Sequence, residues 1–438
     1  MAAKLPQLLP LRALRYDSRA VPDLAAVLCP PYDVISPAER ARLAARDAHN
    51  AVHLELPAEP AAGSTATDRY AAAGRLFADW QATDVLRLDA QPALYVYEQL
   101  YRLPADGAVG RRACGFFCRL RLEPPGGGVR RHERTLAGPK EDRLRLLRAV
   151  RANLSPVLLL YADGAAGARS AALLDELAAG APAAQATDDA GTLHRLWPAD
   201  PATAAGGALV GMAAAGPLTI ADGHHRYETA LRYADEVRAR DAGAAAAAAD
   251  VVLALLFDAA SGGLTLLPTH RLVHCLPAAE SLPDAAAELF TLESQDDGDA
   301  LARRVADAGP GTLGLWTRAG GFVLRPRAAA LAEHLPAGSA ALRSLDVSVL
   351  GAALRRLVGE DPDRLAEAGR LSYTKDAADG LAQVADGRAD ACFLLAATPV
   401  ESVLAVAGAS ELMPPKSTYF VPKAATGLVF NRLDEGQR

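Results

Sequence analysis

The chain has 438 residues, of which 51% are hydrophobic and 22% are charged, and its formal net charge is −6. A protein that coats nucleic acid is normally basic, so this balance argues against nucleic acid as a partner. A chain of this length is expected to form about three domains, or two domains with insertions.

The sequence predicts neither a membrane segment nor an export signal. The N-terminus lacks the charged and then apolar pattern of a secretory signal peptide, and no apolar run reaches the roughly 18 residues of a membrane helix. The five cysteines are scattered, and the close pair Cys114 and Cys118 has no second pair that would complete a zinc site. We therefore expect a cytoplasmic protein with reduced cysteines and no membrane partner.

Residues 1–110 are predicted to form an N-terminal α/β unit. Its "PPYDVIS" sequence at 30–36 is a double-proline turn, after which Ser36 is placed to cap a helix with Pro37 at its first position. Asp33 in this turn could contact a ligand, although the helix cap explains much of the pattern. The other elements expected here are a helix from about Asp68 to Trp80, which follows a loose linker at 61–67, and a strand at 93–103.

Residues 111–278 are predicted to form a core domain. It begins with a strand at 112–123, and a glycine-rich loop follows at 123–128. A helix that carries the arginine-rich stretch after residue 140 should end before Ser155-Pro156, because the residue before a proline avoids the helical conformation. The apolar run at 157–163 reads as a buried strand, and residues 164–216 read as an insertion with a helix, a loop and an edge strand.

The second half of the core domain contains the sequence "PLTIADGHHRYET" at 217–229. Its apolar run predicts a strand over 218–221, followed by a turn at Asp222-Gly223 and a helix from about His225 to Arg238. Residues 279–438 are predicted to form a C-terminal α/β domain. The remaining expected elements are two mutually paired strands at 250–259 and 264–274, strands at 311–317 and 321–326, and a helix at 348–358.

The turn at 222–226 has the residues of an anion site. The first N–H groups of a helix have no partner within the helix, and together with the helix dipole they attract anions. Gly223 allows close backbone approach, Arg226 offers a planar fork for phosphate oxygens, and His224 and His225 add donors. A metal site is disfavoured, since adjacent histidines on a helix rarely bind one ion. A plain polar helix start, capped by Asp222, is the alternative.

Two other segments carry polar side chains suited to catalysis. "RRHERTLAGPK" at 130–140 places His132 and Glu133 among arginines, where a carboxylate stays ionised and can act as a general base. A solvated charge run explains this segment equally well. "ELMPPKSTYF" at 411–420 follows a stiff Pro-Pro pair with donors that suit a phosphate or a small zwitterion, namely Lys416, Ser417 and Thr418. An ordinary turn before a strand is the alternative here.

Taken together, these three segments resemble the free L-serine kinases, which share a fold with the chromosome-partitioning protein ParB and with sulfiredoxin. "IADGHHRYETA" is similar to the DGHHR turn of that family, "RHERTL" to its PHE segment, and the stretch ending in "ELMPPKSTYF" to its C-terminal run with a closing SPKTT. The motifs occur in the same order, over residues 113–438 with insertions. The whole chain is also similar to a widespread bacterial family of longer, largely uncharacterised proteins that keep PPYD near the N-terminus.

The resemblance implies a ParB/sulfiredoxin-like core within an α/β (α+β) protein and gives each motif a role. Glu133, with His132 beside it, would take the proton from a substrate hydroxyl. The residues that would hold the transferring phosphate are Gly223, His224, His225 and Arg226. Asp222 would hold the substrate's ammonium group or a magnesium ion. The residues that would close over the substrate carboxylate or phosphate are Lys416, Ser417 and Thr418.

The activity that this resemblance implies is that of a small-molecule kinase. It would transfer a phosphoryl group from ADP or ATP, with magnesium, to free L-serine or a similar hydroxy amino acid, giving O-phosphoserine. The alternatives are a ParB-type switch that binds and hydrolyses a nucleotide to control a protein partner, and a decayed site that only binds a metabolite. The chain departs from the kinases at Tyr419-Phe420, where they have Arg-His. Sulfiredoxin activity is not expected, because His224 stands where that branch has its cysteine.

Overall fold

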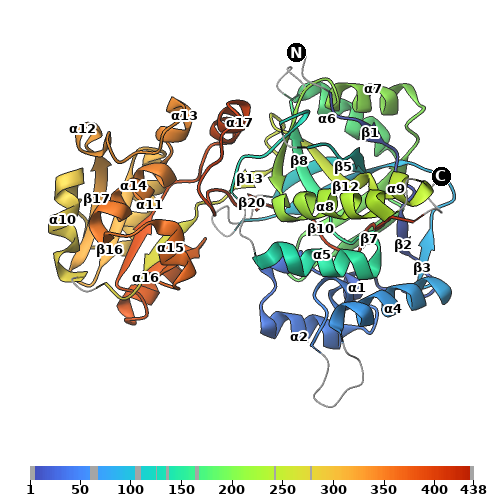
Figure 1. Cartoon of the computed structure of the whole chain (residues 1–438), viewed down its shortest axis with the longest axis horizontal. Helices are drawn as coiled ribbons and strands as arrows, with labels where there is room; N and C mark the ends of the chain where they lie inside the picture. The colour runs from blue at the N-terminus through green and yellow to red at the C-terminus, as the bar shows by residue number, and fades with distance from the viewer. Residues whose placement is uncertain are drawn as a thin grey trace. The chain divides into compact units, whose positions relative to one another are not determined.

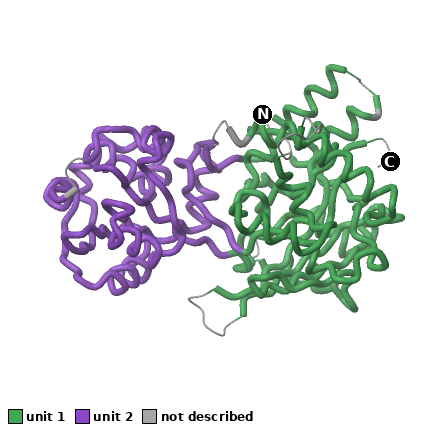
Figure 2. Tube along the Cα trace, turned by 90° about the horizontal axis from the view of Figure 1, so that it is seen from below, with its two compact units in different colours: residues 1–130, 135–264, 422–438 green, residues 131–134, 265–421 purple. Residues whose placement is uncertain are grey.

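The computed structural model describes residues 5–59, 68–103, 110–124, 126–134, 138–162, 167–240, 243–276 and 279–434. Helices and strands alternate along the chain, which confirms the predicted mixed α/β class (Figure 1). The chain divides into two compact units: unit 1 holds residues 1–130, 135–264 and 422–438, and unit 2 holds residues 131–134 and 265–421 (Figure 2). The predicted linker at 61–67 and the predicted boundary residue 278 lie outside the described residues.

The central sheet of unit 1 has the strand order β6-β11-β8-β12-β5-β4-β10-β9, and β1 pairs with β5. Most neighbours are antiparallel, whereas β12 runs parallel to β8 and β11 runs parallel to β6. The predicted strands at 93–103 and 112–123 are confirmed as the antiparallel pair β4 and β5. The strands are β1 (Leu8–Leu9), β4 (Leu94–Tyr101), β5 (Arg111–Arg121), β6 (Val129–Arg130), β8 (Val157–Tyr161), β9 (Ala184–Thr187), β10 (Leu193–Ala199), β11 (Leu218–Asp222) and β12 (Val251–Asp258).

Apolar residues on alternate positions of these strands form the core of unit 1. Phe116, Leu159 and Leu256 share one buried cluster with residues from the helices that cover this face. Strands β8 and β12 are buried along their whole length, as expected for near-continuous apolar runs at the centre of a covered sheet. The surrounding helices are α5 (Gly138–Val150), α6 (Ala168–Leu177), α7 (Ala204–Ala213), α8 (His224–Arg240) and α9 (Ala244–Ala249).

The predicted insertion at 164–216 is more regular than expected. Its helix and edge strand are found as α6 and β9, but β10 and α7 were not predicted. The weak periodicity of this alanine-rich stretch explains the miss, because small side chains give little contrast between a buried and an exposed face.

The N-terminal segments of unit 1 share a second core with the C-terminus of the chain. Trp80 and Phe77 pack with Phe430, whose ring lies 6.0 Å from that of Phe77. The predicted helix cap is confirmed, since the Ser36 hydroxyl accepts the N–H of Glu39 at 3.2 Å. The elements here are β2 (Leu14–Tyr16), α1 (Leu24–Val27), the 3₁₀ turn η1 (Tyr32–Val34), α2 (Pro37–Arg46), α3 (Val52–Glu55), α4 (Arg69–Ala82), β3 (Leu86–Leu88), β7 (Ala152–Asn153) and β21 (Asn431–Arg432).

Unit 2 contains an antiparallel sheet in the order β15-β17-β16-β19-β14-β18. The predicted strands at 311–317 and 321–326 are confirmed as its members β16 and β17. The strands of unit 2 are β13 (Thr265–Leu266), β14 (His270–Val273), β15 (Phe290–Ser294), β16 (Leu313–Thr317), β17 (Gly320–Pro326), β18 (Leu371–Thr374), β19 (Ala391–Leu394) and β20 (Phe420–Val421).

One predicted strand pair is wrong. The segments 250–259 and 264–274 do not pair with each other, because β12 uses both of its edges to bind β5 and β8. The second segment instead forms β13, which pairs with β20, and β14, which joins the sheet of unit 2.

Helices cover both faces of the sheet in unit 2. Along β19, Phe393 belongs to a core shared with α10 and α14, whereas Cys392 and Leu394 belong to one shared with α11 and α16, as the period of two in a strand requires. The helices are η3 (Ala279–Ser281), α10 (Leu282–Leu289), α11 (Gly298–Ala308), α12 (Ala328–Leu331), α13 (Ala340–Arg343), α14 (Asp346–Val358), α15 (Pro362–Glu367), α16 (Ala377–Ala385) and α17 (Val400–Gly408). Within the described ranges, none of the helices is long and apolar enough to cross a bilayer.

Candidate functional site

The turn between β11 and α8 has the predicted strand–turn–helix form. Strand β11 ends at Asp222, Gly223 adopts a φ of +89°, and α8 begins at His224. A Cβ atom at Gly223 would lie 3.1 Å from the guanidinium carbon of Arg226. The left-handed backbone therefore favours glycine, and a larger residue would also push aside the arginine side chain that folds back over this position.

Asp222 is the centre of a partly buried ion network in unit 1. One carboxylate oxygen accepts a hydrogen bond from Arg226 Nη2 and the other from Lys423 Nζ, while Arg226 Nη1 donates to the carbonyl of Pro156. Burial raises the pKa of Asp222, but Lys423 and Arg226 lower it more, so the pKa lies well below its usual range. The network therefore joins two cationic side chains through one carboxylate.

Arg226 is surrounded by residues from the N-terminal part of the chain. Burial lowers the pKa of its guanidinium, but Asp222 and then Asp33 raise it, so that the pKa lies above its ordinary value. Tyr32, beside Asp33 in the PPYD turn, lies under the guanidinium of Arg143 at 4.1 Å from its ring centre. The predicted ligand-contacting position, Asp33, therefore belongs to the surroundings of Arg226.

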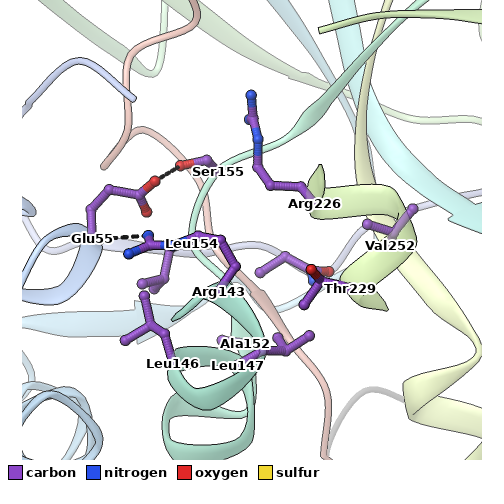
Figure 3. A pocket seen from close by; sticks show the side chains of 11 residues that line it. Glu55, Arg143, Leu146, Leu147, Ala152, Leu154, Ser155, Arg226, Thr229 and Val252 are labelled. Atoms are coloured by element: carbon purple, nitrogen blue, oxygen red, sulfur yellow. Dashed lines mark hydrogen bonds between the residues drawn. The ribbon is translucent and has the colours of Figure 1, made fainter. Parts of the chain in front are cut away.

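A small cavity of about 50 Å³ lies beside Arg226 in unit 1 (Figure 3). Glu55 accepts a hydrogen bond from the Ser155 hydroxyl at 2.7 Å, and Arg143 donates to the Glu55 carbonyl at 2.7 Å. Arg226 Nε and the hydroxyl of Thr229 have no hydrogen-bond partner among the described residues. At roughly 10–15 Å³ per water-sized probe, the cavity has room for a few water molecules and is too small for a nucleotide.

His224 and His225 occupy the first turn of α8, and both are partly buried. In the described part of the chain, no group of three or more His, Cys, Asp or Glu side chains could hold a metal ion. Both oxygens of Asp222 also bind cationic side chains, so this carboxylate does not fit as a resident magnesium ligand.

The second group of predicted residues lies in unit 2, where residues 131–134 run beside residues 411–418. Glu133 and Met413 form a parallel β-bridge, in which Met413 N–H donates to the His132 carbonyl at 2.7 Å. Lys416 has a φ of +58°, which is unusual for a residue other than glycine and marks a tight turn after the two prolines. This backbone pairing brings together segments that are about 280 residues apart in the sequence.

The Glu133 carboxylate is held by this turn. It accepts the N–H groups of Lys416 at 3.0 Å and Ser417 at 3.2 Å, and the Thr418 hydroxyl lies 3.4 Å away. Burial raises the pKa of Glu133, and the hydrogen bond and charge of Lys416 oppose this only in part, so the pKa stays above its ordinary value. His132 is fully buried, with Nε2 2.9 Å from the Thr418 hydroxyl.

The predicted site residues thus form two separate groups. Unit 2 holds one group, made of His132, Glu133, Lys416, Ser417 and Thr418, and unit 1 holds the other, made of residues 222–226. In the segment 416–418, which was predicted to close over the substrate, the Ser417 hydroxyl donates a hydrogen bond to the Pro414 carbonyl at 2.6 Å, whereas the Lys416 side chain is exposed. The sequence reasoning missed three charged residues, Glu55, Arg143 and Lys423. No local spacing marks them, because each acts on a segment distant in the sequence. Lys423 binds Asp222, the charge of Glu55 acts on Arg226, and Arg143 binds the Glu55 carbonyl.

These features define a mixed α/β protein with one polar cluster centred on an ion network and another centred on a carboxylate held by backbone N–H groups. Residues 8–348 match the family described as "Protein of unknown function (DUF1015)". That match covers more than half of the chain, and the chain belongs to this family.

Among solved structures, the chain is similar to "Free serine kinase in complex with AMP" (13% identity, TM-score 0.37, covering 67% of this chain and 84% of that one). It is also similar to a conserved hypothetical protein from Pyrococcus furiosus (14%, TM-score 0.35, 67% and 87%) and to SbnI with a C-terminal truncation from Staphylococcus aureus (12%, TM-score 0.35, 69% and 83%). Likeness this low assigns neither a fold nor an activity to this chain. No curated protein matches it.

Proposed function

We propose that this protein is a nucleotide-dependent phosphotransferase that phosphorylates the hydroxyl of free L-serine or a similar small hydroxy amino acid, with ADP or ATP as the donor. The observation that carries the proposal is the carboxylate of Glu133, which is fixed by the 416–418 turn and has a raised pKa. A general base works best when its pKa lies near the working pH. The three motifs of the sequence support the same reaction.

In the proposed reaction, Glu133 takes the proton of the acceptor hydroxyl. The acceptor oxygen then bonds to the phosphorus atom, the bond from that phosphorus to the leaving oxygen of the nucleotide breaks, and the nucleotide leaves with one phosphate fewer. Such transfer needs mainly positioning and neutralisation of charge. His132 and Thr418 position the carboxylate, and the exposed ammonium of Lys416 neutralises anionic groups of the ligand.

In unit 1, the proposal assigns the binding of phosphate oxygens to Arg226, the histidines and the backbone at Gly223. The two cations that share the Asp222 carboxylate support this role, as does the Nε of Arg226, which has no hydrogen-bond partner among the described residues. Asp222 then acts by holding Arg226 and Lys423 in place. A magnesium ion that accompanies the nucleotide would be held mainly by phosphate oxygens, and the proposed steps do not pass through it.

The test is an assay of purified protein with ADP or ATP, with and without L-serine. We expect nucleotide consumption that depends on serine and a phosphoserine product detected by mass spectrometry. Nucleotide hydrolysis that is indifferent to amino acids contradicts the kinase and supports the nucleotide-dependent switch instead. No consumption and no nucleotide binding contradicts both.

Glu133→Gln separates chemistry from binding. We expect turnover to fall by roughly 10²–10⁴-fold, because the proton acceptor is lost, while nucleotide affinity changes little. In the wild type, the acid limb of the rate profile should have its midpoint above the ~4.3 of an ordinary glutamate. Glu293→Gln, at a partly exposed carboxylate of unit 2, is the matched control. Unchanged turnover in Glu133→Gln, or joint loss of turnover and nucleotide binding, would exclude the assigned role.

A further inference from the structure

Unit 2 contains a cavity that the proposed phosphotransferase does not use. It has a volume of about 90 Å³ and lies between α14, the start of α15, β18 and the Pro414-Pro415 turn. Its walls are largely apolar, with Leu350, Leu354 and Leu371 among the lining residues, all 4% exposed or less. Two buried polar side chains, Arg271 and Ser348, also line it.

Arg271 is a buried cation without a counter-ion. It is only 5% exposed, and its guanidinium donates to the carbonyl of Thr269 and, at 3.1 Å, to that of Lys416. Its remaining neighbour of note is the ring of Tyr373, with the ring centre 5.6 Å from the guanidinium carbon. Within the described ranges, no carboxylate lies within ion-pair distance of it, and burial lowers its pKa to about 10.

In the described part of the chain, none of the nearby carboxylates forms an ion pair with Arg271, although the charge of Glu133 opposes the lowering of its pKa in part. Asp363 pairs with Arg134 at 3.1 Å, Asp361 pairs with Arg355 at 3.5 Å, and all four side chains are more than a third exposed. Glu133 is held by the N–H groups of Lys416 and Ser417. A guanidinium has five N–H groups, and the two hydrogen bonds of Arg271 to carbonyls leave three of them for another acceptor.

Ser348 is an independent sign of a missing partner. This residue is 2% exposed, and its hydroxyl has no hydrogen-bond partner in the described part of the chain. A buried hydroxyl without a partner costs about 1–3 kcal/mol, and an unpaired buried charge costs more. Both costs disappear if a ligand with an anionic acceptor group occupies the cavity.

We propose that this cavity binds a small organic monocarboxylate, with the carboxylate on Arg271 and Ser348 and the carbon chain against Leu350 and Leu354. The planar fork of arginine matches a carboxylate. Arg134 and Arg355 also line the cavity, but each is paired with an aspartate and is more than a third exposed. The buried donors are therefore one arginine and one hydroxyl, which are too few for a doubly charged phosphate, and the apolar walls fit a hydrocarbon chain. At roughly 10–15 Å³ per water-sized probe, the cavity admits an acid of fewer than about ten heavy atoms.

The test is calorimetric titration of the full chain with butanoate, with butanamide as the neutral isostere and inorganic phosphate as the competing anion. We expect binding of butanoate, and at least ten-fold weaker binding of butanamide and of phosphate. Arg271→Met should weaken butanoate binding at least ten-fold, and Ser348→Ala should weaken it several-fold. Arg304→Gln, at a partly exposed arginine of unit 2 that does not line the cavity, is the matched control and should bind as the wild type does.

Hydrogen exchange on the wild type keeps the test independent of how the variants fold. Butanoate should slow amide exchange in peptides from α14 and β18, and butanamide should not. Equal binding of butanoate and phosphate, unchanged binding in a folded Arg271→Met variant, or protection only outside these two elements would overturn the proposal. These measurements use no nucleotide, so their outcome does not depend on the phosphotransferase proposed above.

Discussion

Arg226 in unit 1 and Arg271 in unit 2 are both buried arginines, but their charges are compensated differently. Arg226 binds the carboxylate of Asp222, which it shares with Lys423, and its pKa lies above the ordinary value. Arg271 binds backbone carbonyls only, and burial lowers its pKa to about 10. Burial lowers the pKa of both guanidinium groups, so the stronger carboxylate surroundings of Arg226, with Asp222 first, account for the difference.

This comparison separates two uses of a buried charge. An arginine that is paired within the protein is held in one orientation before any ligand arrives, which is what a phosphate-binding group requires. An arginine without a counter-ion destabilises the empty protein, and this cost is recovered when an anion binds. The paired Arg226 is therefore expected to form a rigid site, and the unpaired Arg271 predicts the position at which an additional ligand binds.

The largest expected effect comes from removing the carboxylate of the compensated network. Asp222→Asn leaves Arg226 and Lys423 without their anion, and breaking a buried ion pair in this way costs about 3–5 kcal/mol of unfolding free energy. Urea unfolding, with hydrogen exchange of unit 1 peptides to localise the change, measures it. Glu293→Gln, whose carboxylate pairs with arginines at the surface of unit 2, should have a much smaller effect. Equal effects of the two variants would show that the Asp222 network is not structurally important.

Asp346 provides the opposite case, a buried carboxyl group that forms no ion pair within the described ranges. It accepts the Gly311 N–H at 2.8 Å, and burial raises its pKa to about 6. A carboxyl whose pKa is higher in the folded than in the unfolded state stabilises the fold when it is protonated. This stability is fully present below the pKa of the unfolded state and is lost as the pH rises through the folded-state value of about 6.

We therefore expect Asp346→Asn to remove up to about 3 kcal/mol of pH-dependent destabilisation. The unfolding free energies of wild type and variant should diverge between about pH 4 and 6, with the variant more stable at pH 7. Urea unfolding at intervals of half a pH unit measures the difference. Parallel curves across that range contradict the assigned environment of Asp346.

Gly223→Ala tests the backbone of the compensated site. The substitution places a side chain at a φ of +89° and brings its Cβ to 3.1 Å from the Arg226 guanidinium carbon. A loss of about 1–3 kcal/mol in unfolding free energy is expected from the strain, with weaker nucleotide binding because Arg226 is displaced. Gly211→Ala in α7, where a Cβ meets no atom within 4 Å, is the control and should be neutral or slightly stabilising. If both variants behave alike, the glycine is not required at the turn.

The sequence correctly predicted those helices and strands whose signals lie within a few consecutive residues. The apolar run before Asp222-Gly223 predicted β11 and the start of α8, and Ser36 with Pro37 predicted the cap of α2. It failed where two elements compete for the same edge, since the pairing of β12 depends on β5 and β8 rather than on the next strand along the chain.

In the candidate sites, too, the sequence predicted some residues from local motifs and missed others that only the folded structure brings into contact. Glu133 and the 416–418 turn were singled out by motif, but their hydrogen bonds join residues about 280 positions apart, and spacing alone cannot predict such contacts. Lys423 and Arg271 carry no local signature at all. Their significance comes from burial and from the presence or absence of a carboxylate, and these are properties of the folded chain.

The last residues of the chain have a consequence for biosynthesis. Phe430 fills the core that holds Trp80 and Phe77, and Asn431 donates to the Asn153 side chain at 2.8 Å. The ribosome makes these residues after the whole of unit 2. Unit 2 can therefore fold while it is being synthesised, whereas unit 1 has to wait with an incomplete core until residues 430 and 431 have been made. A ribosome that stalls before residue 422 would release a chain with one finished unit and one exposed apolar surface.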